Sequence, residues 1–172
     1  LVNINLNNLR DVDAEIENNV ARYIDDGYDA VCTTGKKLAE LKSVGAVRKI
    51  VNAIFRRLFS NIYIEKYNYK NIVKNMYTDI ECRENVYPQL ICGWDRTPRA
   101  GKKAIVYYNS TPAEFKKATE YVLKLVEKKD PEHRIVFLNS WNEWGEGAYM
   151  EPDLKFGTGK IDALREVIYE DD

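Results

Sequence analysis

The chain has 172 residues, of which 45% are hydrophobic and 31% charged, and its formal net charge is −1. This composition is typical of one globular domain, and the balanced charge excludes a general attraction to nucleic acid. Because no apolar run approaches the roughly 20 residues of a membrane-spanning helix, we expect no integral membrane segment. The cysteines are odd in number and widely spaced (Cys32, Cys82 and Cys92). They predict a reduced, cytoplasmic protein without disulfides. Without paired cysteines or a histidine cluster we expect no metal site, and we expect no cofactor.

The first third of the chain predicts strands that alternate with helices. Residues 1–6 have the alternation of a short strand, and residues 11–26 place apolar side chains at helical spacing. Gly27 follows that helix as a typical C-terminal cap, and residues 28–32 predict the next strand.

A long basic stretch, residues 36–59, predicts two amphipathic helices broken near Gly45. Its apolar positions form one stripe, made of Val47, Ile50, Val51, Ile54 and Leu58. We expect this stripe to cover the sheet, and a membrane-surface role is the alternative.

The rest of the chain continues the alternation. A short helix is predicted over 67–77 and a strand over 86–93. Thr111 and Pro112 are a strong helix start, with the threonine as N-cap and the proline at the first helical position. That helix should run to about residue 129. The expected elements that follow are a buried strand over 134–138 and a final helix over 161–169.

This alternation predicts an α/β fold with a parallel sheet, in which ligands bind beyond the C-terminal ends of the strands. Two polar and aromatic groups follow predicted strands and should therefore share one end of the sheet. One group is Trp94, Asp95 and Arg96, and the other is Trp141, Asn142, Glu143 and Glu146. His133 precedes its strand, so we expect an exposed loop histidine at the opposite end.

The second group belongs to a run of carboxylates and aromatic rings, which reads Asn139-Ser140-Trp141-Asn142-Glu143-Trp144-Gly145-Glu146-Gly147-Ala148-Tyr149-Met150-Glu151-Pro152-Asp153. Aromatic faces stack on pyranose rings, and paired carboxyl groups supply acid and base. The run therefore points to sugar chemistry.

This run resembles the signature of the WbsX-type glycosyltransferase family of bacterial polysaccharide biosynthesis, which is related to glycoside hydrolase family 99. Two further segments agree with the family pattern: Trp94-Asp95-Arg96-Thr97-Pro98-Arg99, and Ser110-Thr111-Pro112 followed by Phe115. The sequence departs from the pattern at Arg96, where the family usually has asparagine.

The resemblance implies a (β/α)8 barrel, which typically needs about 250 residues. We therefore expect residues 1–172 to be the C-terminal part of a single (β/α)8 glycoside hydrolase 99-like domain, with the missing N-terminal half of the barrel as a partner. Such a half barrel should have two unpaired sheet edges and an exposed inner face.

The resemblance also implies that Glu143 and Glu146 are the catalytic pair. Glu143 would assist the 2-hydroxyl of the sugar as a base, and Glu146 would protonate the leaving oxygen, with retention through a 1,2-anhydro sugar. The two acids can converge only if the chain curls after Asn142, which Gly145 and Gly147 permit. The alternative is that both acids cap backbone amides.

A wider set of residues forms the predicted substrate site: Trp94, Asp95, Arg96, Trp141, Asn142, Trp144, Tyr149 and Glu151. Each has a structural alternative. The tryptophans and Tyr149 can be core residues, and Glu151 can cap the backbone. For Asp95 we favour an internal ion pair with Arg99 over a contact with substrate. The basic loop 99–103 can contact a phosphate, although a solvated loop is the favoured interpretation.

Together these features predict a carbohydrate-active protein of bacterial lipopolysaccharide or capsule metabolism. Its substrate would be an oligosaccharide or sugar donor, and the reaction glycosyl transfer or glycoside cleavage. A non-catalytic glycan-binding or truncated remnant domain is one alternative, and a stand-alone α/β interaction domain is another.

Overall fold

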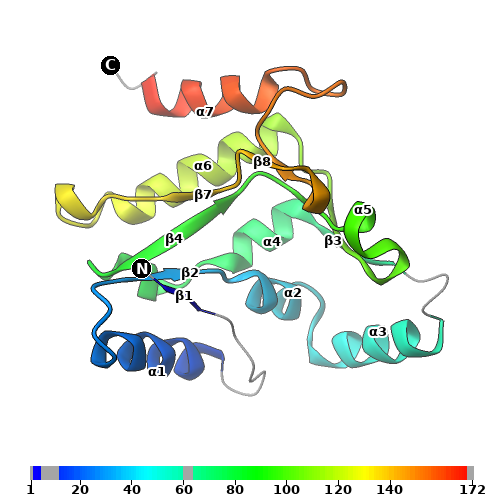
Figure 1. Ribbon diagram of the computed structural model, residues 1–172, viewed down its shortest axis with the longest axis horizontal. Helices are drawn as coiled ribbons and strands as arrows, with labels where there is room; N and C mark the ends of the chain where they lie inside the picture. The colour runs from blue at the N-terminus through cyan, green and yellow to red at the C-terminus, as the bar shows by residue number, and fades with distance from the viewer. Residues whose placement is uncertain (1, 5–11, 60–63, 170–172) are drawn as a thin grey trace.

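The computed structural model of the chain describes residues 2–4, 12–59 and 64–169 (Figure 1). At its centre is a four-stranded parallel sheet in the order β1-β2-β4-β7. Its strands are β1 (Val2–Ile4), β2 (Val31–Thr33), β4 (Val86–Ile91) and β7 (Phe137–Asn139). Strands that follow one another along the chain are neighbours in this sheet, so the predicted parallel sheet is present.

Helices alternate with the strands along the chain. They are α1 (Val12–Asp25), α2 (Lys36–Val44), α3 (Ala46–Leu58), α4 (Tyr69–Met76), the short α5 (Thr97–Ala100), α6 (Pro112–Val126) and α7 (Gly159–Tyr169). The predicted helix ends are confirmed at three points. Gly27 and Gly45 have positive φ angles of 91° and 75°, and the Thr111 hydroxyl accepts a hydrogen bond from the backbone N–H of Glu114.

A second, smaller sheet was not predicted from the sequence. It contains β3 (Glu65–Asn68), β6 (Ile105–Tyr108) and β5 (Trp94–Asp95), in the order β3-β6-β5. A hairpin of β8 (Asn142–Glu143) and β9 (Ala148–Tyr149) is the third β unit. Each of these strands has four residues or fewer, which is too short for a two-residue period to stand out.

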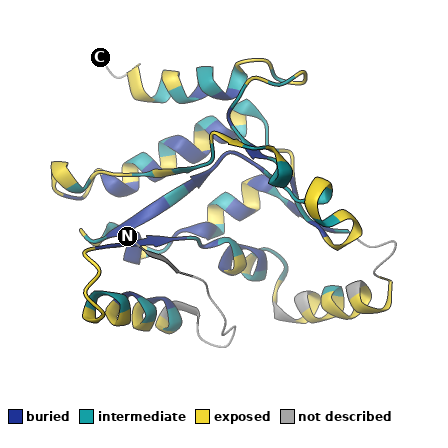
Figure 2. Cartoon of the chain, in the orientation of Figure 1, coloured by how far each residue is buried: buried dark blue, intermediate teal, exposed yellow. Residues whose placement is uncertain are grey.

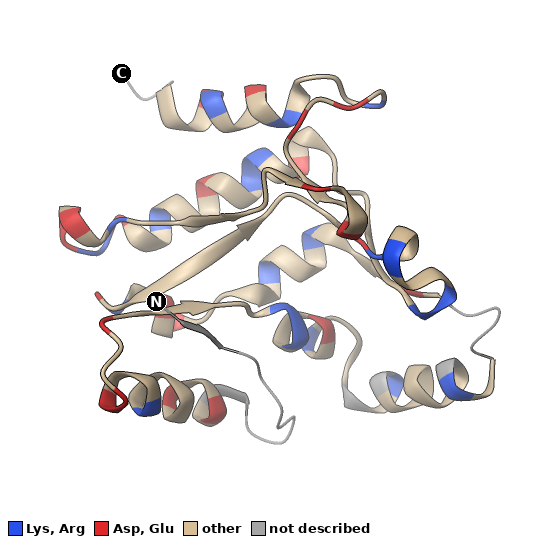
Figure 3. Cartoon of the chain, in the orientation of Figure 1, with Lys and Arg blue, Asp and Glu red and all other residues tan. Residues whose placement is uncertain are grey.

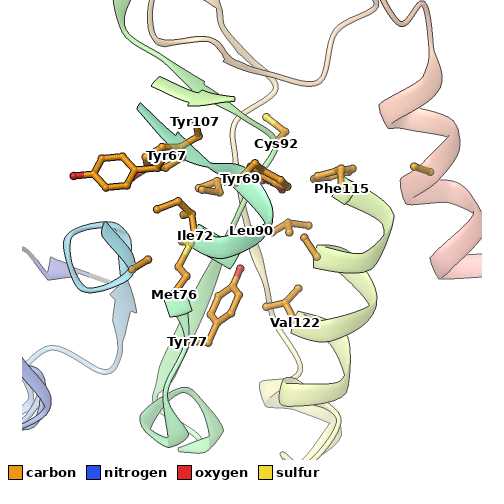
Figure 4. Close-up of a cluster of buried hydrophobic side chains, with 14 of the residues drawn as sticks. Tyr67, Tyr69, Ile72, Met76, Tyr77, Leu90, Cys92, Tyr107, Phe115 and Val122 are labelled. Atoms are coloured by element: carbon orange, nitrogen blue, oxygen red, sulfur yellow. Dashed lines mark hydrogen bonds between the residues drawn. The ribbon is translucent and has the colours of Figure 1, made fainter. Parts of the chain in front are cut away.

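The larger core cluster lies where α4 and α6 meet β4 (Figure 4). Tyr69, Ile72, Phe115 and Val122 are all fully buried there. The Tyr69 hydroxyl donates a hydrogen bond of 2.6 Å to the Ile91 carbonyl. This bond satisfies the one polar atom of the ring and joins α4 to the end of β4.

The predicted burial of the strand before the acidic run is wrong. Ile135 is 42% exposed and Phe137 36% exposed, because β7 is the last strand of the sheet in the described part of the chain (Figure 2). Strand β2 in the middle of the sheet is buried throughout.

The exposed inner face expected of a half barrel is not found at β2 and β4, where every residue except Gln89 is buried. Cys32 and Tyr87 are register partners on one face of these strands. The Tyr87 ring packs against Phe137 and His133, and the Lys129 ammonium lies 4.8 Å from its centroid. These side chains cover Tyr87.

The expected cover role of the second basic helix, α3, is also wrong. Its stripe of Val47, Ile50, Val51, Ile54 and Leu58 is exposed to between 42% and 78%. Helix α3 projects away from the sheet beyond Gly45 (Figure 1), while the preceding helix α2 buries Leu38 and Ala39. In the part of the chain that the structure describes, no helix combines the length and apolarity needed to cross a membrane.

Candidate glutamate site at the ends of β4 and β7

The acidic run forms a tight turn directly after β7. Strand β8 ends at Glu143, a 3-10 turn follows over Trp144–Glu146, and β9 returns antiparallel. The Ser140 hydroxyl donates to the Ala148 carbonyl at 2.7 Å and accepts from the Glu143 N–H at 3.2 Å. These bonds fix the backbone from which both glutamates extend.

Gly147 allows this turn to lie against the segment after β4. Its φ angle is 60°, in the left-handed region that favours glycine. A Cβ at this position would come within 2.7 Å of the backbone nitrogen of Asp95. The absence of a side chain therefore brings the acidic turn into contact with β5.

The two glutamates converge on one arginine. The Arg99 guanidinium lies 3.1 Å from Oε1 of Glu143 and 3.0 Å from Oε1 of Glu146. The curl that the sequence required after Asn142 is therefore present. Figure 3 shows the acidic turn beside the basic helix α5.

Arg96 is a second cation at the pair, with its Nε 3.2 Å from Oε1 of Glu146. These ion pairs join the segments after β4 and β7, so the expectation that both lie at one end of the sheet is confirmed.

The expected ion pair of Arg99 with Asp95 is wrong. Asp95 instead accepts hydrogen bonds from the N–H and hydroxyl of Thr97, at 2.8 and 2.6 Å.

Lys36 also belongs to this site and was missed in the sequence. It opens α2 just beyond β2, and its ammonium lies 3.4 Å from the centroid of the Trp94 ring. Burial lowers the pKa of Lys36 to about 8, while the negative charges of Glu146 and Glu40 oppose that shift. Its place three residues after β2 was the available signal, because β2 ends at the same edge as β4.

The aromatic residues divide between half-buried and exposed positions. Trp94 is half-buried and packs against Tyr107. Trp144 stacks on Tyr149 with ring centroids 3.8 Å apart, and its indole N–H donates to Glu151. Glu151 therefore orients a tryptophan rather than capping the backbone.

The core alternative is wrong for Trp141 and Trp144, which are 52% and 45% exposed. Asn142 is exposed beside them. The basic loop after Arg99 is helical but exposed at residues 101–103. This matches the solvated interpretation of that loop.

His133 lies away from the glutamates, as expected. It precedes β7, and its Nδ1 is 2.9 Å from the Tyr87 hydroxyl. Because the ring also stacks on Tyr87, His133 is half-buried rather than the exposed loop residue that was expected. Within the described ranges, no group of histidine, cysteine and acidic residues has a metal-binding arrangement.

The site thus combines two convergent carboxylates, three cations and exposed or half-buried aromatic rings at the C-terminal end of a parallel sheet. The carboxylates can serve as acid and base if the arginines release them. The aromatic faces can stack on pyranose rings.

Comparison with known proteins agrees with the signature in the acidic run. The chain is 28% identical over 148 residues to an uncharacterized protein named WxcX from Xanthomonas campestris pv. campestris strain B100, and equally to WxcX of strain ATCC 33913. The match covers 84% of this chain and 20% of each relative, so the chain spans about a fifth of their length. No solved structure matches the chain. The family model described as Glycosyltransferase WbsX matches residues 4–164, and the chain therefore belongs to the WbsX glycosyltransferase family.

Proposed function

We propose that this chain is part of a carbohydrate-active domain that makes or cleaves glycosidic bonds in bacterial surface-polysaccharide metabolism, such as that of lipopolysaccharide or capsule. The observation that carries the proposal is the convergence of Glu143 and Glu146 on the Arg99 guanidinium. Membership of a glycosyltransferase family supports it. The free thiols of the three cysteines support a cytoplasmic location.

The sheet is, in this proposal, one half of a (β/α)8 barrel. Four parallel strands in chain order with helical connections support this fold, as does a site at their C-terminal ends. Strands β1 and β7 are the edges at which the other half of the barrel would pair. That half is then the expected partner of this chain.

In the proposed reaction, Glu143 removes the proton from the 2-hydroxyl of the sugar, whose oxygen attacks the anomeric carbon. Glu146 protonates the leaving oxygen, and a 1,2-anhydro sugar forms. Water or an acceptor hydroxyl then opens that ring, which gives cleavage or transfer. Arg99 must release both carboxylates first, and its side chain, 53% exposed, has solvent into which it can move.

Sugar rings would stack on the tryptophans around the pair. Trp94 packs against Lys36 and Tyr107, and Trp144 packs against Tyr149 and donates to Glu151, so both rings are held in place. A fixed ring loses little entropy when it contacts a ligand. Trp141, which is more exposed, would contact a more distant unit of an oligosaccharide.

A non-catalytic glycan-binding domain is the second candidate. It is favoured by the same Arg99 contacts, because a guanidinium bound to both carboxylates leaves neither free for proton transfer. Exposed Trp141 and Trp144 suit binding as well as catalysis.

The two candidates are separated by Glu143→Gln and Glu146→Gln, assayed for turnover and binding of an oligosaccharide panel. Loss of a positioned acid or base costs roughly 10²- to 10⁴-fold in rate. We expect a decrease of that order in kcat/KM for each variant, with the dissociation constant nearly unchanged.

The matched control is Glu132→Gln, whose side chain is 82% exposed and precedes β7. It should keep parental turnover. Oligosaccharide binding by the parent without any turnover would contradict the enzyme and support the binding domain.

A further inference from the structure

A pocket of about 550 Å³ lies beside the glutamate site. The segment after β4, the end of β6 and the chain between β9 and α7 surround it. Trp144 and Gly147 line this pocket and belong to the same turn as Glu143 and Glu146. A molecule in the pocket would therefore lie next to the proposed catalytic pair.

One charged group in this pocket is nearly buried without a direct hydrogen bond. Lys160, in the first turn of α7, is only 7% exposed. Its ammonium makes no hydrogen bond or ion pair with any residue in the described part of the chain. Its nearest ring is that of Tyr149, with the centroid at 5.1 Å.

Lys160 points toward the backbone after β4. A Cβ added to Gly93 would lie 3.4 Å from the Lys160 ammonium and 3.2 Å from the Ser110 hydroxyl. That hydroxyl already donates to the Cys92 carbonyl. Burial lowers the pKa of Lys160, with the charges of Cys92 and Asp153 acting in the opposite direction.

The carboxylates that line the pocket are engaged elsewhere. Asp153 accepts hydrogen bonds from the backbone N–H groups of Lys155 and Phe156, at 2.7 and 2.6 Å. Asp95 is bound by the N–H and hydroxyl of Thr97. Asp153 therefore acts on Lys160 only through space, and no carboxylate of the pocket binds the Lys160 ammonium directly.

A nearly buried ammonium that makes no direct hydrogen bond is costly, because it has lost part of its water without a full replacement. An anionic oxygen placed beside Lys160 would remove that cost. The walls suit a sugar, since the aromatic rings of Trp144 and Tyr149 line the pocket.

We propose that this pocket binds an anionic sugar, a pyranose carrying a phosphate or carboxylate, with the anionic oxygen on the Lys160 ammonium. The inference rests on the proposed function for its sugar and names the charge class of that sugar. It adds Lys160 as the residue that selects for charge.

Isothermal titration of the full chain tests this with glucose 1-phosphate, glucuronate, glucose and inorganic phosphate. We expect one of the two charged sugars to bind at least tenfold more tightly than both glucose and inorganic phosphate. The tighter of the two identifies the anion. Glucose binding equal to that of both charged sugars, or inorganic phosphate binding as tightly as the better of them, would overturn the proposal.

The variants are Lys160→Met and Lys160→Arg. Methionine has a similar shape without charge, so the preference for the charged sugar should disappear while the unliganded protein unfolds at an equal or higher temperature. Arginine should keep the preference. A lysine with only a structural role would give the opposite results, a lower unfolding temperature for methionine with the preference intact.

The control is Lys124→Met on the exposed surface of α6, which should bind like the parent. The same titrations with Glu143→Gln should retain the charge preference. A failure of the charge preference would appear in these binding titrations, whereas a failure of the proposed reaction would appear only in turnover assays. The two failures can therefore be distinguished.

Discussion

Arg99 and Arg96 hold Glu143 and Glu146 through partly exposed ion pairs, with arginine side chains 53% and 40% exposed. An exposed pair such as Arg99–Glu143, whose side chains are 53% and 40% exposed, stabilises a protein by about 0–1 kcal/mol. A bound sugar can therefore displace Arg99 from Glu143 at small cost. The arginines are compatible with a working pair of acids, provided that substrate binding moves Arg99.

The sequence indicated some of these residues and not others. Glu143 and Glu146 could be identified because they lie in one dense run with aromatic residues. Arg99 could be noticed, but the sequence pointed to Asp95 as its partner, because the distant glutamates reach it only in the folded chain. Lys36 had only its place after β2 as a signal, and Lys160 had no local pattern.

The lowered pKa of Lys36 predicts how the stability of the protein changes with pH. Its folded pKa of about 8 is below the ordinary value of 10.5, so the unfolded state binds more protons between these pH values. Below pH 8 the buried charge of this lysine therefore lowers the free energy of unfolding by its full amount. This destabilisation decreases as the pH rises toward 10.5.

We expect the free energy of unfolding of the parent to rise relative to Lys36→Met over this window. Denaturant titrations at pH 7, 8, 9 and 10 would measure it. A difference between the two proteins that stays constant with pH would contradict the buried position of Lys36.

At the scale of elements, caps and turns were more informative than apolar patterns. Thr111 with Pro112 predicted the start of α6, and Gly27 and Gly45 marked helix ends, because each has a local backbone requirement. The stripe of α3 was identified correctly as one face of a helix. Periodicity shows that a face is apolar, but only the tertiary structure shows whether anything covers it.

This difference predicts unequal costs of truncation in the two basic helices. Leu38 in α2 is 1% exposed, whereas Ile54 in α3 is 50% exposed. Leu38→Ala should lower the free energy of unfolding by about 2–5 kcal/mol, because it leaves a cavity. Ile54→Ala should change it by less than about 0.5 kcal/mol. Equal losses in urea titrations would show that α3 covers the sheet after all.

At the scale of the whole molecule, the edges of the sheet determine how the chain behaves. Strand β7 begins at exposed Phe137 and follows exposed Ile135, and an open strand edge is a template for pairing with another chain. The parallel order could be predicted from the alternation of elements. The placement of β7 at an edge could not, because its apolar sequence is also that of a buried strand.

The half-barrel proposal therefore predicts association of the purified chain. Sedimentation velocity should give a mass above the 20.0 kDa of one chain, rising with concentration. Phe137→Lys should reduce it, since a charged residue at an edge strand opposes pairing. A monomer at every concentration would support a stand-alone domain instead.

The central claim is that Glu146 donates a proton to a leaving oxygen, and a series of leaving groups tests it most directly. A leaving group that is already stable as an anion needs no proton, whereas an alkoxide does. In turnover assays, Glu146→Gln should keep near-parental kcat/KM for a dinitrophenyl glycoside and lose roughly 10²- to 10⁴-fold for an alkyl or oligosaccharide substrate. An equal loss for both substrates, or no loss for either, would contradict the account.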